Sequence, residues 1–347
     1  MKYIYFIGRY TGHGLYKILN LYKENYRPYE IEGIKKSSNI QITNNINKAD
    51  IIMFRNKPEK TNDNHLKKFN SILKRYGKNK MIINSSNSFY NFDSKERSYQ
   101  LWRDNGLNAP DFIAFDYTDI KTNENQVIES INQFVKKKNK IFLRTNNETG
   151  SKGMFLITYK HSYQDIKKCL KKLYYRLSKI SENRSDSRLL AVEFLNIKNE
   201  DYINLYRAHV IKDKIICFYV ISSTKNQFHC KDMTMENLDE FIKANSDFNN
   251  SLKTDKRISM EITKSLKVLN MELGAVEFFI INNKIYFLEL NPIWNGHASR
   301  EGFGSKEFQE YLIKNQSILK QTIPNIYKWL DYSNFYRSMY DEISILS

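Results

Sequence analysis

The amino-acid sequence predicts an α/β protein in which a small parallel α/β layer is followed by two lobes of mixed helix and strand. Three observations support this fold class. The first 84 residues alternate apolar strand signals with amphipathic helix signals. Later in the chain, two segments read as strand, tight turn and strand, which is the pattern of a β-hairpin. The length of 347 residues also allows two or three domains, each with its own core.

The N-terminal layer follows from the order of its strand and helix signals. Strand signals at residues 2–8, 49–56 and 80–84 alternate with helical apolar patterns, at Leu15–Leu21 and around His65–Tyr76. Strands that alternate with helices are typical of βαβ units. The strands of this layer are therefore expected to be parallel.

A glycine-rich loop, Gly8–Gly14, follows the first predicted strand. Open α/β sheets bind ligands at this end of their strands. The loop is not a dinucleotide-binding fingerprint, because Lys17 stands where the third glycine of G-x-G-x-x-G would be. We therefore expect it to contact a substrate or to form a plain turn.

The middle of the chain is expected to form a helix, a pair of strands and a longer helix. Residues 94–106 read as a helix that is closed by its last residue, a glycine. Residues 140–159 read as strand, glycine loop and strand, and a long helix then runs to about Ile180. The polar stretch Ser181–Arg188 is interpreted as a linker.

The C-terminal half is predicted to contain more strands and a helical tail. The strands are expected within residues 188–196, 204–222 and 275–291. The last two segments turn at Lys212–Lys214 and at Asn282–Asn283, and a helix over about Lys256–Leu273 separates them. The aromatic tail, residues 326–347, is expected to be helical.

The hairpin at residues 275–291 carries the most informative polar side chains. Glu289 and Asn291 are two residues apart, so their side chains share one face of the strand, and Glu277 on the other arm can point to the same face. Two carboxylates and an amide oxygen among apolar neighbours cost free energy unless a cation neutralises them. Mg²⁺ prefers such oxygen ligands. The alternative, in which the acids simply face water, stays open at this point.

A second glycine-rich loop, Asn147–Gly153, lies between two predicted strands. Its glycines would let backbone N–H groups approach phosphate oxygens, and Ser151 and Lys152 add a hydroxyl and a positive charge. The alternative is an ordinary hairpin loop. It is not a Walker A loop, because a strand follows it where a helix would be required.

In this order and spacing, the segments resemble the ATP-grasp superfamily over roughly residues 84–295. The segments that carry the resemblance are Asn84, Asp93–Lys95 with Gly106 eleven residues after the lysine, IFLRTNNETGSKGMFLI, LLAVEFLN, the strand that begins Tyr206-Arg207, and GAVEFF…YFLELNP. The resemblance implies an N-terminal pre-ATP-grasp domain and two lobes that clamp ATP. The boundaries expected for the domain, the two lobes and the tail are 1–86, 87–188, 189–325 and 326–347.

The resemblance also implies which residues contact ATP. The phosphates would be held by Lys95 and Arg144 at the α and β positions, and covered at the β and γ positions by Gly150, Ser151, Gly153 and Lys152. Adenine would be lined by Glu193, Phe194 and Leu195, and the ribose would be bound by Glu200 or Asp201. Arginine at position 144 departs from the family's usual lysine, and it replaces a compact ammonium by a planar fork.

A further set of residues is implied for the metal and for catalysis. Glu277, Glu289 and Asn291 would bind one or two Mg²⁺ ions, or Mn²⁺ in their place. The family's usual aspartate is replaced by Glu277. Arg207 would stabilise the transferring phosphoryl group.

The implied activity is that of an ATP-dependent ligase, which converts a carboxylate into an acyl phosphate and joins it to an amine. Its partners would be small molecules, or a peptide. The acceptor site is expected to use Arg9–Gly14 and Trp294–Arg300, where His297 would orient or deprotonate the amine and Arg300 would hold a carboxylate. The alternative is that His297 and Arg300 only hold a loop in place.

Two other functions stay open. One is an ATP-grasp kinase that phosphorylates a small anionic substrate. The other is a nucleotide-binding protein without turnover, which the intact set of metal-ligand residues disfavours.

The composition narrows the cellular setting. A net charge of +17 would suit a polyanionic partner, but the lysines are spread along the chain, so nucleic-acid binding ranks last among the hypotheses. Three cysteines without a close pair do not suggest a disulfide framework or a zinc site. No signal peptide or membrane span is recognised, so a cytoplasmic protein is expected, and a homodimer would be common for such an enzyme.

Overall fold

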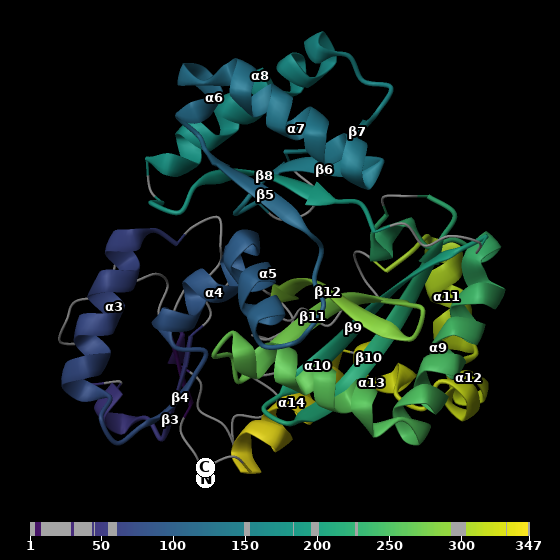
Figure 1. Ribbon diagram of the computed structural model, residues 1–347. Helices are drawn as coiled ribbons and strands as arrows, with labels where there is room; N and C mark the ends of the chain where they lie inside the picture. The colour runs from purple at the N-terminus through teal and green to yellow at the C-terminus, as the bar shows by residue number, and fades with distance from the viewer. Residues whose placement is uncertain are drawn as a thin grey trace.

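The molecule is built on three four-stranded sheets (Figure 1). This computed structural model describes residues 4–7, 29–30, 44, 46–54, 61–148, 153–182, 184–195, 201–225, 228–292, 303–330 and 332–345. Figure 1 shows one sheet in an upper lobe, one in a lower lobe and one in a smaller N-terminal layer beside them. The predicted α/β fold class, with parallel and antiparallel sheets, is confirmed.

The N-terminal sheet is parallel throughout, as predicted. Its strands are β1 (Ile4–Ile7), β2 (Tyr29–Glu30), β3 (Ile51–Phe54) and β4 (Met81–Ile83), in the order β2-β1-β3-β4. Helix α3 (Asp63–Tyr76) packs on the sheet through Phe69, whose ring meets that of Phe54 edge-on at 5.2 Å. The two-residue strand β2 was not predicted, and the helix expected at Leu15–Leu21 lies outside the described residues.

Two helices join the N-terminal sheet to the lobes. They are α4 (Phe89–Asp93) and α5 (Lys95–Asp104), which follow a 3-10 turn η2 (Ser86–Ser88). Helix α5 begins where it does because the Ser94 hydroxyl accepts a hydrogen bond from the Arg97 backbone at 3.2 Å, the usual N-cap arrangement. It ends before Gly106, whose φ of +76° is the left-handed conformation that suits glycine after a helix.

The upper lobe is an antiparallel sheet covered on one face by helices. The strands β5 (Phe112–Asp116), β6 (Lys140–Thr145), β7 (Met154–Thr158) and β8 (Arg188–Glu193) lie in the order β5-β8-β6-β7. The covering helices are α6 (Asp119–Thr122), α7 (Glu124–Lys138) and α8 (Tyr163–Ser181) (Figure 1). Ile141 and Leu143 alternate with polar or aromatic neighbours and are buried beneath these helices, so the opposite face of β6 carries Phe142 and Arg144. Strand β5 was not predicted.

The lower lobe contains the two predicted hairpins. Its strands are β9 (Ile203–Ile211), β10 (Lys214–Ser223), β11 (Leu273–Ile281) and β12 (Lys284–Asn291), in the order β10-β9-β11-β12. The turns lie where the sequence placed them. Lys212, Asn282 and Asn283 have φ of 48°, 50° and 60°, and asparagine is among the few residues that adopt this conformation at low cost.

Apolar side chains cover both faces of the lower sheet. One face packs on α5, α9 (Leu238–Thr254) and α10 (Lys256–Val268), and the other packs on the C-terminal helices and the N-terminal sheet. Helix α10 is shorter than predicted, because the chain reverses at Asn270, which has a φ of 55°, and β11 already begins at Leu273. The apolar residues of that strand continued the helical pattern of the sequence, which explains the error. Helix α9 was not predicted.

The C-terminal tail is helical, as predicted. Its helices are α11 (Lys306–Lys314), α12 (Gln316–Thr322), α13 (Ile326–Leu330) and α14 (Tyr332–Ile345). Asn325 and Asn245 also cap the outer edge of β10: the amide oxygens accept from Phe218 N and Val220 N, each at 2.9 Å. These two N–H groups of the edge strand are therefore not left open to pair with another strand. No helix among the described residues is long and apolar enough to cross a membrane.

Asn84 joins the N-terminal sheet to the lower lobe. Its side chain donates to Leu273 O at 2.8 Å and accepts from Leu273 N at 3.0 Å, while its backbone N–H donates to Glu272 Oε2 at 2.7 Å. The residue is buried and has a φ of 55°. Asparagine therefore supplies both the left-handed backbone and the hydrogen bonds of this junction.

We predict that Asn84→Ala destabilises the protein by about 3 kcal/mol, of which about 1 kcal/mol is backbone strain and the rest lost buried hydrogen bonds. The measurement is urea unfolding. Asn270→Ala is the matched control, because Asn270 has the same φ of 55° but is exposed. Equal losses in the two variants would show that the Asn84 side chain contributes nothing to the junction.

Candidate functional site

A row of polar side chains crosses one face of the lower sheet. Cross-strand partners point to the same face of an antiparallel sheet, and the register places Tyr219, Arg207, Glu277 and Glu289 in one such row. Arg207 Nη1 donates to Glu277 Oε1 at 2.8 Å. Asn291 lies in the next row, opposite Ala275. The structure therefore brings the three predicted metal ligands and Arg207 onto one face.

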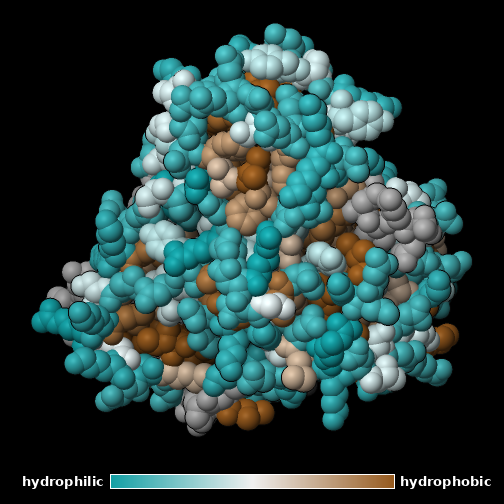
Figure 2. All heavy atoms as spheres, in the orientation of Figure 1, coloured by the Kyte–Doolittle hydropathy of each residue, from teal (hydrophilic) through white to brown (hydrophobic). Residues whose placement is uncertain are grey.

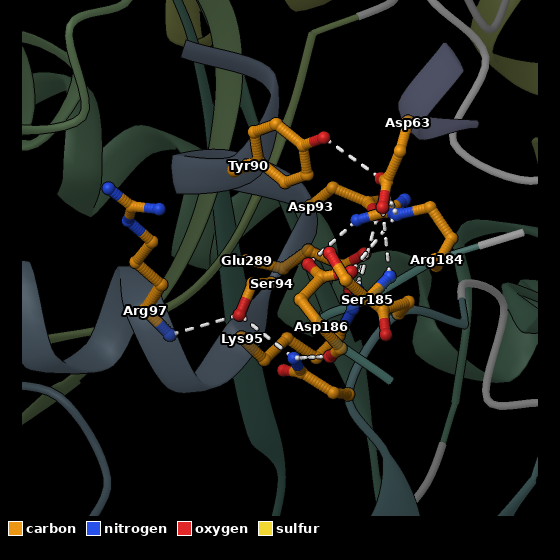
Figure 3. A network of polar contacts seen from close by, with 12 residues as sticks. Asp63, Tyr90, Asp93, Ser94, Lys95, Arg97, Arg184, Ser185, Asp186 and Glu289 are labelled. Atoms are coloured by element: carbon orange, nitrogen blue, oxygen red, sulfur yellow. Dashed lines mark hydrogen bonds and ion pairs between the residues drawn. The ribbon is translucent and has the colours of Figure 1, made fainter. Parts of the chain in front are cut away.

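Two further cations approach the carboxylates from outside this sheet. Lys95, the first residue of α5, has its Nζ 3.5 Å from Glu289 Oε1, and its side chain is only 2% exposed (Figure 3). Arg144 comes from β6 of the upper lobe and interacts electrostatically with Glu289. Three cations from three different elements thus face two adjacent carboxylates.

The pKa values follow from this arrangement. Burial raises the pKa of Glu277, and the neighbouring Glu289 adds to the increase. Burial acts in the same direction on Glu289, but Lys95, Arg144 and Arg207 together outweigh it and hold the pKa of Glu289 below its ordinary value. Burial lowers the pKa of Lys95, although Glu289 opposes the change. The pair therefore contains one well-stabilised carboxylate and one whose charge is costly without a further cation.

The oxygen ligands of the site fit an Mg²⁺ ion whose remaining ligands are phosphate oxygens and water. Among the described residues, no group of three or more His, Cys, Asp or Glu side chains is placed to hold a metal by itself. Glu277 and Glu289 offer two carboxylates, and Asn291 offers an amide oxygen. Mg²⁺ is commonly bound by one or two carboxylates, with substrate phosphates and water as the other ligands. These residues fit that pattern, and they do not fit a closed four-ligand zinc site.

A cavity of 720 Å³ is lined by residues of both lobes, and its size is in the range of small-molecule sites. Glu193, Phe194 and Leu195, the residues expected to line adenine, are part of its wall. Lys138 and Asp111 were not foreseen. Lys138 Nζ lies 3.0 Å from Glu193 Oε1 and 2.5 Å from Asp111 Oδ2, so one lysine forms ion pairs with two carboxylates of the wall.

Apolar side chains lie on the uncovered side of the upper sheet, near this cavity (Figure 2). Figure 2 shows apolar surface over β5 and β8 of the upper lobe and between the two lobes, whereas hydrophilic side chains cover the outer helices. Phe142 and Phe194 contact each other at a ring distance of 5.3 Å on the uncovered side of the upper sheet. The cavity wall therefore combines the Phe194 ring with the polar side chains of Asp111, Lys138 and Glu193.

The two ends of the glycine loop are tied together, although Gly150, Ser151 and Lys152 lie outside the described residues. Arg176 holds Glu148 with two hydrogen bonds, from Nε at 2.9 Å and from Nη2 at 2.5 Å, and Thr145 Oγ1 donates to the same carboxylate at 2.8 Å. Gly153, at the far end of the loop, packs directly on this pair with a φ of +60°. These contacts were not predicted from the sequence. Arg176 lies in a later helix, 28 residues after Glu148, so no local pattern links the two residues.

Several predicted site residues lie outside the part of the chain that the structure describes. They are Glu200, His297, Arg300 and the loop Arg9–Gly14. Asp201 is described, and it is exposed just before β9.

The stretch Ser181–Arg188 is not the solvated linker that its composition suggested. Arg184 within it is only 4% exposed and forms ion pairs with Asp93 and Asp186 (Figure 3). The polar composition misled because the partners that bury this arginine come from elsewhere in the fold. Arg184 and Asp93 are 91 residues apart, so no local spacing could have indicated the pair.

Comparisons with known proteins show similarity in fold only. No protein-family model and no curated protein sequence matches the chain. Among solved structures, it is similar to D-alanine–D-alanine ligase from Bacillus anthracis complexed with ATP, with a TM-score of 0.53, 11% identity, and coverage of 98% of this chain and 96% of that one. It is also similar to the ATP-grasp ligase PsnB complexed with a minimal precursor (TM-score 0.51, 12% identity, 85% and 92% covered). N5-carboxyaminoimidazole synthetase from Staphylococcus aureus complexed with ADP is similar as well (TM-score 0.53, 15% identity, 85% and 72% covered).

We predict that Gly153→Ala costs about 2 kcal/mol in unfolding free energy, measured with urea. An added Cβ would lie 2.5 Å from Glu148 Oε2 and 2.9 Å from Arg176 Nε, so the ends of these two side chains must shift and their ion pair is weakened, in addition to the strain of the positive φ. Gly106→Ala is the control, since its φ is +76° but no atom lies within 4 Å of the added Cβ. It should cost only about 1 kcal/mol. A Gly153→Ala variant as stable as Gly106→Ala would contradict the proposed packing.

Proposed function

We propose, from the premise that this chain has the ATP-grasp fold, that it is an ATP-dependent ligase that joins a carboxylate to an amine through an acyl phosphate. One observation carries the proposal: three cations, on Lys95, Arg144 and Arg207, lie close to the carboxylates of Glu277 and Glu289. Alternating charges of this kind stabilise a bound phosphate chain and its counter-cation together. A site made only for stability would place apolar residues on this face of the sheet.

In this proposal, ATP lies between the two lobes. Its adenine would occupy the cavity beside Phe194 and Leu195, and its phosphates would extend toward Lys95 and Arg144. Gly150, Ser151, Lys152 and Gly153 would cover the β- and γ-phosphates, while Glu200 or Asp201 would bind the ribose. Lys95 would then exchange its contact with Glu289 for a phosphate oxygen.

The metal ligands have a clear place in this proposal. Glu277, Glu289 and Asn291 would hold one or two Mg²⁺ ions, which supply positive charge to the phosphate oxygens when bound. Arg207 lies beside Glu277 and would stabilise charge that develops on the transferred phosphoryl group. Its buried Nε has no hydrogen-bond partner among the described residues, so the guanidinium retains donor capacity.

The proposed reaction has two steps. A carboxylate oxygen of the substrate attacks the γ-phosphorus of ATP. The bond from this phosphorus to the oxygen that bridges the β- and γ-phosphates breaks, ADP departs, and an acyl phosphate is formed. The amine nitrogen of the second substrate then attacks the acyl carbon, the bond from that carbon to the phosphate oxygen breaks, and the amine loses a proton. The products are an amide, ADP and inorganic phosphate. His297 and Arg300 are proposed for the acceptor side.

We predict that calorimetry finds ATP binding that Mg²⁺ strengthens, and that Glu289→Gln reduces the affinity for Mg·ATP at least about tenfold. Without Mg²⁺ the same variant should bind ATP no more weakly than the wild type, because a negative charge has been removed near the phosphates. Glu261→Gln is the control, since Glu261 pairs with Arg257 on the surface of α10. A folded wild-type protein that does not bind ATP would refute the proposal.

We also predict that hydroxylamine distinguishes a ligase from a kinase. With Mg·ATP and an accepted carboxylate, an acyl phosphate reacts with hydroxylamine to form a hydroxamate, and ADP is released in equal amount. Candidate carboxylates include amino acids and acidic peptides. The release of ADP with a hydroxyl-bearing acceptor that contains no carboxyl group, and without hydroxamate, would favour the kinase instead.

A further inference from the structure

Arg184 lies in a buried polar network beside the start of α5 (Figure 3). Its Nη1 donates to Asp93 Oδ2 at 2.5 Å, and its Nε and Nη2 donate to the two oxygens of Asp186 at 3.0 and 2.7 Å. The guanidinium also lies over the ring of Phe89, with 4.8 Å to the centroid. One planar group therefore fixes two carboxylates from different parts of the chain.

One arm of the network leads to Lys95. Asp93 is only 2% exposed, stands two residues before Lys95, and interacts electrostatically with it. Ser94, between them, is the N-cap of α5. Because the backbone from Asp93 to Lys95 includes this cap, the position of Asp93 determines where α5 begins and where the lysine is directed.

A second arm leads to the start of the glycine loop. Asn147 Nδ2 donates to Asp186 Oδ2 at 3.1 Å and to Asp93 Oδ2 at 3.4 Å. Asn146 Nδ2 donates to Ser94 Oγ at 2.8 Å, and its Oδ1 accepts from Glu96 N at 2.9 Å. Both asparagines are buried and directly follow β6. The first turn of α5 and the root of the loop therefore share one set of hydrogen bonds.

A third arm reaches the N-terminal layer. Asp63 accepts from Ser185 N at 3.0 Å and from Tyr90 Oη at 2.8 Å, and it lies 3.9 Å from Arg184 Nε. This arm points away from Lys95. Loss of the Tyr90 hydroxyl removes one hydrogen bond of this arm, while Asp63 and the Tyr90 ring stay beside Arg184.

Stability alone does not account for such a network. A buried ion network loses much of its Coulomb energy to desolvation, and apolar residues of similar volume often stabilise a fold better. What the planar fork of arginine supplies, and a lysine cannot, is a fixed spacing between two carboxylates. Here one carboxylate, Asp93, stands just before the helix that carries Lys95, and the other, Asp186, accepts a hydrogen bond from Asn147 at the start of the glycine loop.

We propose that Arg184 is a positioning residue of the nucleotide site. Through Asp93 and Asp186 it fixes the distance between Lys95 and the start of the glycine loop, so that both meet the phosphates of one nucleotide. This inference rests on the proposed function for its ligand. It predicts an effect on the phosphates and none on the base, since the adenine cavity is lined by other residues.

The test compares Arg184→Lys with the wild type in the full-length protein. Lysine keeps the positive charge but cannot bridge both carboxylates. The affinity for Mg·ATP, measured by calorimetry, should fall about tenfold or more, because small displacements of binding groups are costly. The affinity for adenosine, measured by ligand-observed NMR, should stay within about twofold, because adenosine has no phosphates.

One further variant serves as a control, and another is a second test. Tyr90→Phe removes only the hydrogen bond to Asp63, and it should leave the affinity for Mg·ATP unchanged. Asn147→Ala leaves Arg184 in place but removes the bonds to Asp186 and Asp93, so it should weaken Mg·ATP and spare adenosine. If Arg184→Lys does not fold, Asn147→Ala decides the question.

Amide hydrogen exchange separates this inference from the proposed function. The Glu96 N–H bonds to Asn146, so it should exchange faster in Arg184→Lys than in the wild type, with or without a ligand. If the wild type binds Mg·ATP and Arg184→Lys binds it equally well, the inference is overturned while the proposed function stands. If the wild type does not bind ATP, the proposed function fails. In that case, an unchanged exchange rate at the Glu96 N–H overturns the positioning role of Arg184 as well. A faster exchange rate supports the role of Arg184 in holding Lys95 and the start of the glycine loop in place.

Discussion

The carboxylates of Glu277 and Glu289 are direct neighbours on one face of a largely apolar sheet. Much of the structure around them brings positive charges close enough to offset their repulsion. Arg207, the next residue in the same row, neutralises part of this charge from within the sheet. The rest comes from outside, from Lys95 on α5 and from Arg144 on the upper lobe. The site thus requires two lobes and the connecting helix to be held at definite positions, since separation of the lobes would remove cations from a buried negative charge.

The packing around the site meets this requirement in two different ways. Apolar side chains on both faces of the lower sheet fix its helices by burial, which is strong but tolerant of small shifts. Directional hydrogen bonds then fix the elements that carry charge. Arg184 holds Asp93 near Lys95, Asn84 holds the start of β11, and Glu148 with Arg176 holds the ends of the glycine loop. Directional contacts are placed where an error of position would be most costly.

Asparagine occupies many of the turns and junctions in this structure. The chain has only 12 glycines, and five of the six described non-glycine residues with positive φ are asparagines. Asparagine accepts the left-handed backbone at lower cost than other side chains, and it adds a donor and an acceptor that glycine lacks. At Asn282 and Asn283 the benefit is a tight hairpin turn. At Asn84 it is a junction between two sheets, and at Asn245 and Asn325 asparagine side chains cap the edge of β10.

The sequence by itself determined the features that depend on near neighbours in the chain. Alternation placed Glu289 and Asn291 on one face, turn residues located both hairpins, and a terminal glycine closed α5. Only the tertiary structure decided which distant charges meet. Arg184 belongs to a stretch that reads as a linker, Lys138 lies 55 residues before Glu193, and the end of α10 was obscured by the apolar start of β11. The physical reason is that strand period and turn geometry arise from local sterics, whereas a buried ion pair forms only where packing has brought its partners together and excluded water.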